Sequence, residues 1–173
     1  MRPTVAHSFL LSLLITGGCS QLGDRPQATP APKQTTLELR DYQTATFETN
    51  ELSLITKVIL DVLRDDGFVI GSYDRELGII NASKLVNFGS RDDARKAFQE
   101  FGVELKANKR ISIDLSANIS QFGTGSRVRV IFRVNVLHKS GQVKDTAVAS
   151  SPESYRVFFR KVQQGLFLQS QQL

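Results

Sequence analysis

Hydrophobic and polar positions alternate most clearly in two stretches, residues 109–119 and 127–137. The apolar positions of these stretches are Ile111, Ile113, Leu115, Ala117 and Ile119, then Val128, Val130, Phe132, Val134 and Val136. A period of two over five repeats predicts half-buried strands. The segment 121–125, which contains Gly123 and Gly125, separates them and predicts a short hairpin loop. We therefore expect a long hairpin with one apolar face for the core and one polar face.

Apolar residues recur at spacings of three and four in three other segments, which predicts amphipathic helices. The first helix is expected to begin with Asn50 as its N-cap and to end at Gly67; the last begins with Ser151 as N-cap, followed by Pro152. A short helix between them is expected to begin with Ser90 and to stop near Gly102. The predicted buried stripes are Leu52, Ile55, Val58, Ile59, Val62 and Leu63; then Ala94, Ala97, Phe98 and Phe101; then Tyr155, Phe158, Phe159, Val162 and Leu166, with Phe167 at the margin.

The remaining ordered segments are expected to be strands. Residues 37–48 predict an irregular first strand, whereas residues 68–70 and 79–85 predict a pair joined by a turn over 73–78. The resulting order is β-α-β-β-(α)-β-β-α. This order predicts an α+β fold, in which two amphipathic helices cover one face of an antiparallel sheet of about four to five strands. We place this single domain at residues 37–173.

The N-terminal residues resemble a bacterial lipoprotein signal. An apolar run over residues 9–15 precedes Thr16-Gly17-Gly18-Cys19, and Cys19 is the only cysteine in the chain. The run is shorter than the roughly 20 residues of a spanning helix, so we expect residues 1–18 to be a removable signal peptide and Cys19 to be lipidated. The alternative is an ordinary signal peptide cleaved near a free thiol, since Thr16 departs from the aliphatic residue usual there.

This resemblance implies a location. Ser20 after the cysteine suggests the outer membrane, on its periplasmic side, with the inner membrane as the alternative. Residues 19–36 include Pro26, Pro30 and Pro32 and lack large apolar residues apart from Leu22, which predicts a flexible tether.

Composition and charge narrow the function further. The formal net charge of +5 is modest, and basic residues are not interleaved with aromatic ones on one element, so we expect no nucleic-acid partner. His138 is the only histidine left after processing, and no set of Cys and His residues has zinc-ligand spacing. We therefore expect no metal, no cofactor and no catalytic residues; the chain is predicted not to be an enzyme.

The polar face of the long hairpin is the one candidate surface. It carries Arg127, Arg129, Ile131, Arg133 and Asp114. An antiparallel register would place the arginines near Asp114, Ser112, Ser116 and Asn118, where cross-strand pairs can form. Two interpretations stay open. The face is a solvated sheet surface, or it docks another envelope protein or an anionic polymer.

Three segments together resemble a family of small proteobacterial envelope lipoproteins without an assigned activity. They are Asp65-Asp66-Gly67-Phe68-Val69-Ile70, Leu77-Gly78-Ile79-Ile80-Asn81-Ala82-Ser83-Lys84, and the aromatic segment from Tyr155 to Leu168. A looser similarity is to the α+β domains of lipoproteins attached to outer-membrane assembly machines. Two functions follow as hypotheses: a non-enzymatic, lipid-anchored protein that binds a protein partner or supports an envelope complex, or a periplasmic ligand-binding or regulatory module that uses a cleft between sheet and helix.

Overall fold

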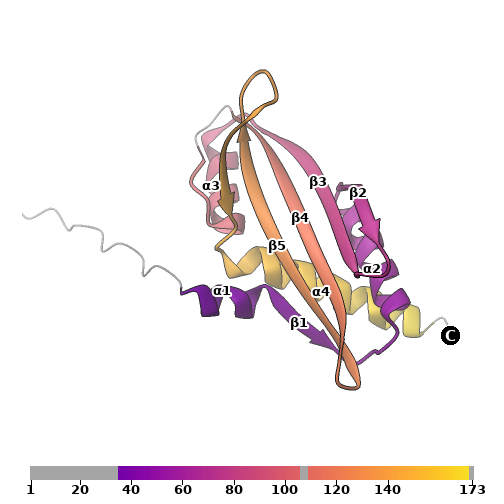
Figure 1. The fold of residues 1–173 in the computed structure, drawn as a ribbon. Coiled ribbons are helices and arrows are strands. Elements are labelled where there is room, and N and C mark those ends of the chain that lie inside the picture. Colours follow the sequence, from indigo (N-terminus) through magenta and orange to yellow (C-terminus); the bar gives the residue numbers. More distant parts are fainter. Residues whose placement is uncertain (1–34, 106–108, 172–173) are drawn as a thin grey trace, which may run out of the picture. The chain divides into compact units, whose positions relative to one another are not determined.

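The two alternating stretches form the centre of a six-stranded antiparallel sheet in the computed structural model, which describes residues 35–105 and 109–171 (Figure 1). They are β4 (Lys109–Phe122) and β5 (Gly125–Leu137). β3 (Ile79–Phe88) pairs with β4 along its whole length, and β2 (Val69–Asp74) pairs with β3 at the edge. The predicted hairpin is thus confirmed, with a tighter turn than expected because residues 121, 122 and 125 belong to the strands.

The opposite edge of β5 is shared by two short strands. β6 (Val143–Val148) pairs with residues 133–137 of β5, and β1 (Thr44–Phe47) pairs with residues 126–129. Because both are antiparallel to β5, they run in the same direction, one after the other. We call this arrangement the split edge. β6 is an addition to the predicted order, since residues 143–148 lack the clear alternation of the central strands.

A buried tyrosine bridges the gap between β1 and β6 in the split edge. The hydroxyl of Tyr155, a residue with 0% exposure, donates to the Ala149 carbonyl at 2.9 Å and accepts from Gln43 Nε2 at 3.4 Å. The backbone N–H of Val130 donates to the Gln43 carbonyl at 2.8 Å, and the N–H of Ala149 donates to the Phe132 carbonyl at 2.9 Å. The residues that flank the two strands therefore satisfy two backbone groups of β5 at the gap, the N–H of Val130 and the carbonyl of Phe132.

Three helices cover one face of the sheet: α2 (Leu52–Asp65), α3 (Arg91–Phe101) and α4 (Pro152–Ser170) (Figure 1). Alternate side chains of the central strands point toward them and form the core with the helix stripes. The largest fully buried strand side chains are Ile80, Ile111, Ile113, Leu115, Val128, Val130 and Val134. The predicted α+β class, with helices on one face of an antiparallel sheet, is confirmed.

Most of the predicted helix ends are confirmed. Ser90 and Asp93 form a capping box, Ser151 caps α4 with Pro152 at the first helical position, and Gly102 ends α3 with φ of 68°. The prediction for Asn50 is wrong. Glu51 occupies the N-cap of α2 without a side-chain bond to the helix backbone, while Thr49 Oγ1 accepts from the Glu51 N–H at 3.2 Å and turns the chain before the helix.

The expected strand over residues 37–48 is also wrong in its first half. Residues Thr36–Tyr42 form a helix, α1, none of whose residues is buried. Thr35 and Glu38 form a capping box at its start, and these local hydrogen bonds favour helix over strand. Thr35 and Thr36, the last residues of the expected tether, thus belong to this helix and its cap. The expected signal peptide and the rest of the expected tether lie outside the described residues.

Three aromatic side chains differ from the predicted stripes. Phe98 is 49% exposed and Phe167 is 60% exposed, while Phe159 is half-buried. Each follows a buried residue directly, and one residue turns a helix by roughly 100°, which moves the next side chain off the packed stripe.

Candidate functional site

The face of the sheet opposite α2, α3 and α4 carries no helix in the described part of the chain (Figure 1). We call it the open face. Its side chains come from alternate positions of β3, β4 and β5 and are mainly Ser, Asn and Arg. On β4 and β5 this face includes Ser112, Asp114, Ser116, Asn118, Ser120, Arg127, Arg129, Ile131, Arg133 and Asn135.

All five residues of the predicted partner surface lie on the open face. Arg133 stands directly opposite Asp114 in the register, and Arg129 stands opposite Asn118, as the hairpin alternation led us to expect. Ile131 is opposite Ser116 and is half-buried. Arg127 was also expected near Asp114, Ser112, Ser116 and Asn118. It lies instead opposite Ser120 at the end of the face, because the hairpin turn is tight.

Asp114 is held by neutral donors. Its carboxylate accepts from the hydroxyl of Ser112 and from Asn135 Nδ2, the latter at 2.6 Å. Asn135 Oδ1 in turn accepts from Thr146 Oγ1 at 2.8 Å, so the network links β4, β5 and β6. No ion pair within 4.0 Å among residues 35–105 and 109–171 includes Arg133, which is exposed. Its guanidinium is therefore available to a partner.

The other two arginines are partly engaged. The Arg127 guanidinium lies 3.5 Å from the centroid of the Phe122 ring, a cation–π contact. Arg129 Nη2 donates to Gln43 Oε1 at 3.3 Å, whereas its Nε is buried and has no hydrogen-bond partner in the described residues. Both side chains are thus held on the face with their charge uncompensated by a carboxylate among those residues.

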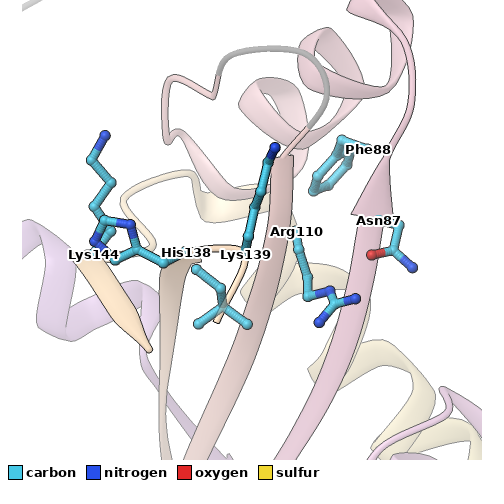
Figure 2. Close-up of a pocket in the computed structure, with 7 residues that line it drawn as sticks. Asn87, Phe88, Arg110, His138, Lys139 and Lys144 are labelled. Carbon is cyan, nitrogen blue, oxygen red and sulfur yellow. The ribbon is translucent and has the colours of Figure 1, made fainter. Parts of the chain in front are cut away.

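A hollow lies where β3 and β5 end and β4 and β6 begin (Figure 2). Its volume is about 480 Å³, and it is lined by Asn87, Phe88, Arg110, Leu137, His138, Lys139 and Lys144. We call it the basic hollow, because three of these residues carry full positive charges and none is a carboxylate. Asn87, Arg110 and Leu137 share one row of the sheet register, so the hollow continues the open face at its end.

The basic hollow was not predicted from the sequence, in which His138 stood out only as a single histidine without metal-ligand partners. His138 is exposed, and it begins the turn that leads into β6. The available signal was the basic residues on both sides of this turn, Lys139 and Lys144. Arg110 could not be added from the sequence, since only the pairing of β4 with β5 brings it beside Leu137.

The three segments that carry the family resemblance meet beneath the sheet. Asp66 follows α2, and its carboxylate forms an ion pair with Lys161 of α4. Lys84 of β3 donates from Nζ to the Asp66 carbonyl at 3.3 Å, and the same Nζ lies 4.8 Å from the centroid of the Phe68 ring. This cluster joins α2, β3 and α4. It also explains an acidic residue at a helix C-terminus, where the dipole disfavours it.

Glu100 of α3 borders the same cluster. Desolvation raises the pKa of its carboxyl and the charge of Asp66 adds to this, while Lys84 and Lys161 act in the opposite direction. A cleft of about 110 Å³ lies between these charges and the rings of Phe101, Phe132 and Phe158. Ligand sites usually measure roughly 300–1,000 Å³, so this cleft has room for little more than solvent or a small ion.

A wider groove of about 560 Å³ runs between β1 and the end of α4. Its apolar lining is Phe47, Leu54, Leu166 and Phe167, and Glu48 is the one charged residue among the described residues that line it. It is the larger of the two hollows between sheet and helix described here. In residues 35–105 and 109–171, no group of three or more His, Cys, Asp or Glu side chains is placed to hold a metal ion.

No helix in the described ranges is both long enough and apolar enough to span a membrane. No protein-family model matches the chain, and no curated protein matches it at significant similarity.

Proposed function

We propose that this chain is a lipid-anchored envelope protein that faces the periplasm and binds a protein partner, without enzymatic activity, through the open face of its sheet. The observation that carries the proposal is the open face itself. It is a broad polar surface with no covering helix in the described part of the chain, on which Arg133 is exposed and outside any ion pair of those residues.

The composition of the open face supports a contact surface. Arginine is enriched at protein interfaces because its planar fork forms several hydrogen bonds at once. Ile131 is half-buried amid these arginines, and the exposed Leu85 and Val148 lie on the same face, at 68% and 42% exposure. A partner of acidic or amide-rich surface would pair with the arginines and cover these apolar groups.

The alternative function, ligand binding in a cleft between sheet and helix, is favoured by one observation, the groove between β1 and α4. If the groove binds apolar ligands, a hydrophobic fluorescent dye should bind to the wild-type chain, and this binding should be lost when Leu54 is replaced by Glu. We prefer the open face because its arginines supply specific recognition, which the groove lining lacks apart from Glu48.

Anchoring and partner binding need separate tests. For anchoring, cells are labelled with a palmitate analogue. The wild-type chain should be labelled and should fractionate with the outer membrane, whereas Cys19→Ser should be unlabelled and leave the membrane fraction. A wild-type chain that is unlabelled and carries a free thiol would contradict the lipid anchor while leaving partner binding open.

For partner binding, a photo-crosslinking residue replaces Ser116 on the open face, and in a matched chain it replaces Gln163 on the exposed side of α4. Ultraviolet light applied to intact cells should give one discrete adduct from position 116 only. Arg133→Glu in the same chain should abolish that adduct, and Arg160→Glu on α4 should not. Equal adducts from both positions would refute the assignment of the open face.

A further inference from the structure

The basic hollow gathers like charges that repel one another. Arg110 begins β4, Lys139 lies in the turn after β5, and Lys144 lies in β6, so three separate segments bring their cations to one depression. His138 adds an imidazole, and its backbone N–H donates to the Gln142 carbonyl at 2.8 Å, which closes the turn. Figure 2 shows these side chains around the ends of the strands.

The charges of the hollow are not neutralised within the described ranges. None of Arg110, Lys139 and Lys144 takes part in an ion pair within 4.0 Å among residues 35–105 and 109–171. Among the residues that the structure describes, no carboxylate lines the hollow either. An anion that entered would relieve this repulsion and would accept charge-assisted hydrogen bonds, which are about twice as strong as neutral ones.

The donor set favours phosphate over carboxylate. Three cations and the Asn87 amide surround the hollow, and a phosphate monoester offers three terminal acceptor oxygens, whereas a carboxylate offers two. A phosphodiester also offers two terminal oxygens, but it adds two ester oxygens in a tetrahedral arrangement around phosphorus. The volume of about 480 Å³ exceeds that of one phosphate and leaves room for an attached group beside Leu137 and Phe88. Phosphate recognition commonly combines an arginine fork with lysine point charges.

We propose that the basic hollow binds a phosphate group, carried either by a soluble phosphate compound or by a phospholipid headgroup. This site adjoins the end of the open face but is lined by residues other than Arg133, and it does not depend on the proposed function. Arg110 lies on β4 and Lys144 on β6, the strands on either side of β5, and we expect the two side chains to hold the anion between them.

The test uses the full-length chain with Cys19→Ser, so that acylation cannot drive membrane binding. Inorganic phosphate is titrated at constant ionic strength against sodium chloride, and the backbone amides of His138 and Lys144 are followed by NMR. The double variant Arg110→Gln/Lys144→Gln should weaken binding by roughly tenfold or more, because charge-assisted bonds are lost. The control, Arg75→Gln/Arg160→Gln, removes the same charge from exposed sites outside the hollow and should leave binding unchanged.

A second arm distinguishes the source of the phosphate. Vesicles of phosphatidylglycerol in phosphatidylcholine are compared with phosphatidylcholine alone by co-sedimentation. Binding to the anionic vesicles that disappears in Arg110→Gln/Lys144→Gln identifies a lipid headgroup. Binding of inorganic phosphate without vesicle binding identifies a soluble compound. Neither kind of binding, or equal losses in the two double variants, would overturn the proposal.

Discussion

Gly165 of α4 packs directly against Val58 of α2. A Cβ placed on this residue would lie 2.6 Å from Val58 Cγ1, whereas carbon atoms in contact are normally about 3.5–4.0 Å apart. Val58 is only 3% exposed, and a β-branched side chain within a helix has essentially one χ1 rotamer, so it cannot turn away. Gly165→Ala therefore requires the two helices to separate.

Two opposing effects determine how Gly165→Ala changes the free energy of unfolding. Replacing glycine by alanine inside a helix stabilises it by about 1 kcal/mol, while overpacking a filled contact costs about 1–3 kcal/mol. We expect Gly165→Ala to lower the free energy of unfolding by up to about 2 kcal/mol. In a Val58→Ala background the clashing methyl is absent, and the nearest remaining atom of that side chain, its Cβ, is at 3.8 Å. There the same change should stabilise by about 1 kcal/mol.

Urea unfolding of the wild type, both single variants and the double variant measures this coupling. A comparison of Gln164→Gly with Gln164→Ala, at the exposed neighbouring position, measures how much alanine stabilises this helix relative to glycine when no packing contact is involved. The reasoning predicts a change of sign between the two backgrounds. If Gly165→Ala stabilises the wild type as much as it stabilises Val58→Ala, the helices are not in contact at Gly165 and the packing described here is wrong.

Three further predictions concern single side chains. Phe158→Ala, at a buried ring that packs against other aromatic residues, should cost about 3–5 kcal/mol in urea unfolding; Phe167→Ala on the same helix, at an exposed ring, should change stability by less than about 0.5 kcal/mol, and equal effects would contradict the assigned burial. Burial raises the pKa of Tyr155, so the folded chain keeps a proton that the unfolded chain releases above about pH 10. Stability should therefore fall as the pH rises past that value, and Tyr155→Phe should lose this dependence while costing about 1–3 kcal/mol at neutral pH. Asn135→Ala should detach β6, seen as faster hydrogen exchange of its amides with unchanged exchange in β3; uniform protection would show that the Asn135 network does not hold that strand.

The sequence allowed the centre of the fold to be predicted, because residues in β4 and β5 alternate over most of their length and the helix stripes are long. α1 was missed although its signal was present: Thr35 and Glu38 have the capping-box spacing, but residues 36–42 lack an apolar stripe. β6 was missed because it lies at an edge, where five of its six residues are exposed and packing imposes little pattern.

The candidate surfaces differ in how far the sequence could predict them. The open face followed from alternation alone, since Arg127, Arg129 and Arg133 share a parity along one strand. The hydrogen-bond partners of Asp114 could not be predicted from the alternation. Asn135 is buried and donates to Asp114 in place of the expected arginine. The basic hollow needed tertiary structure, as it combines residues from separate strands and a turn.

The split edge has a consequence for the order in which the chain folds. β2–β3, β4–β5 and β5–β6 pair segments that are close in sequence, but β1 pairs with a segment of β5 about 85 residues further along. The entropy of closing that long loop makes β1 the last strand to dock. Until it returns, the edge of β5 at residues 126–129 has unpaired backbone groups, which a second copy's β1 would match equally well. Refolding at high protein concentration is therefore the condition under which two copies are expected to exchange this strand and form a domain-swapped dimer.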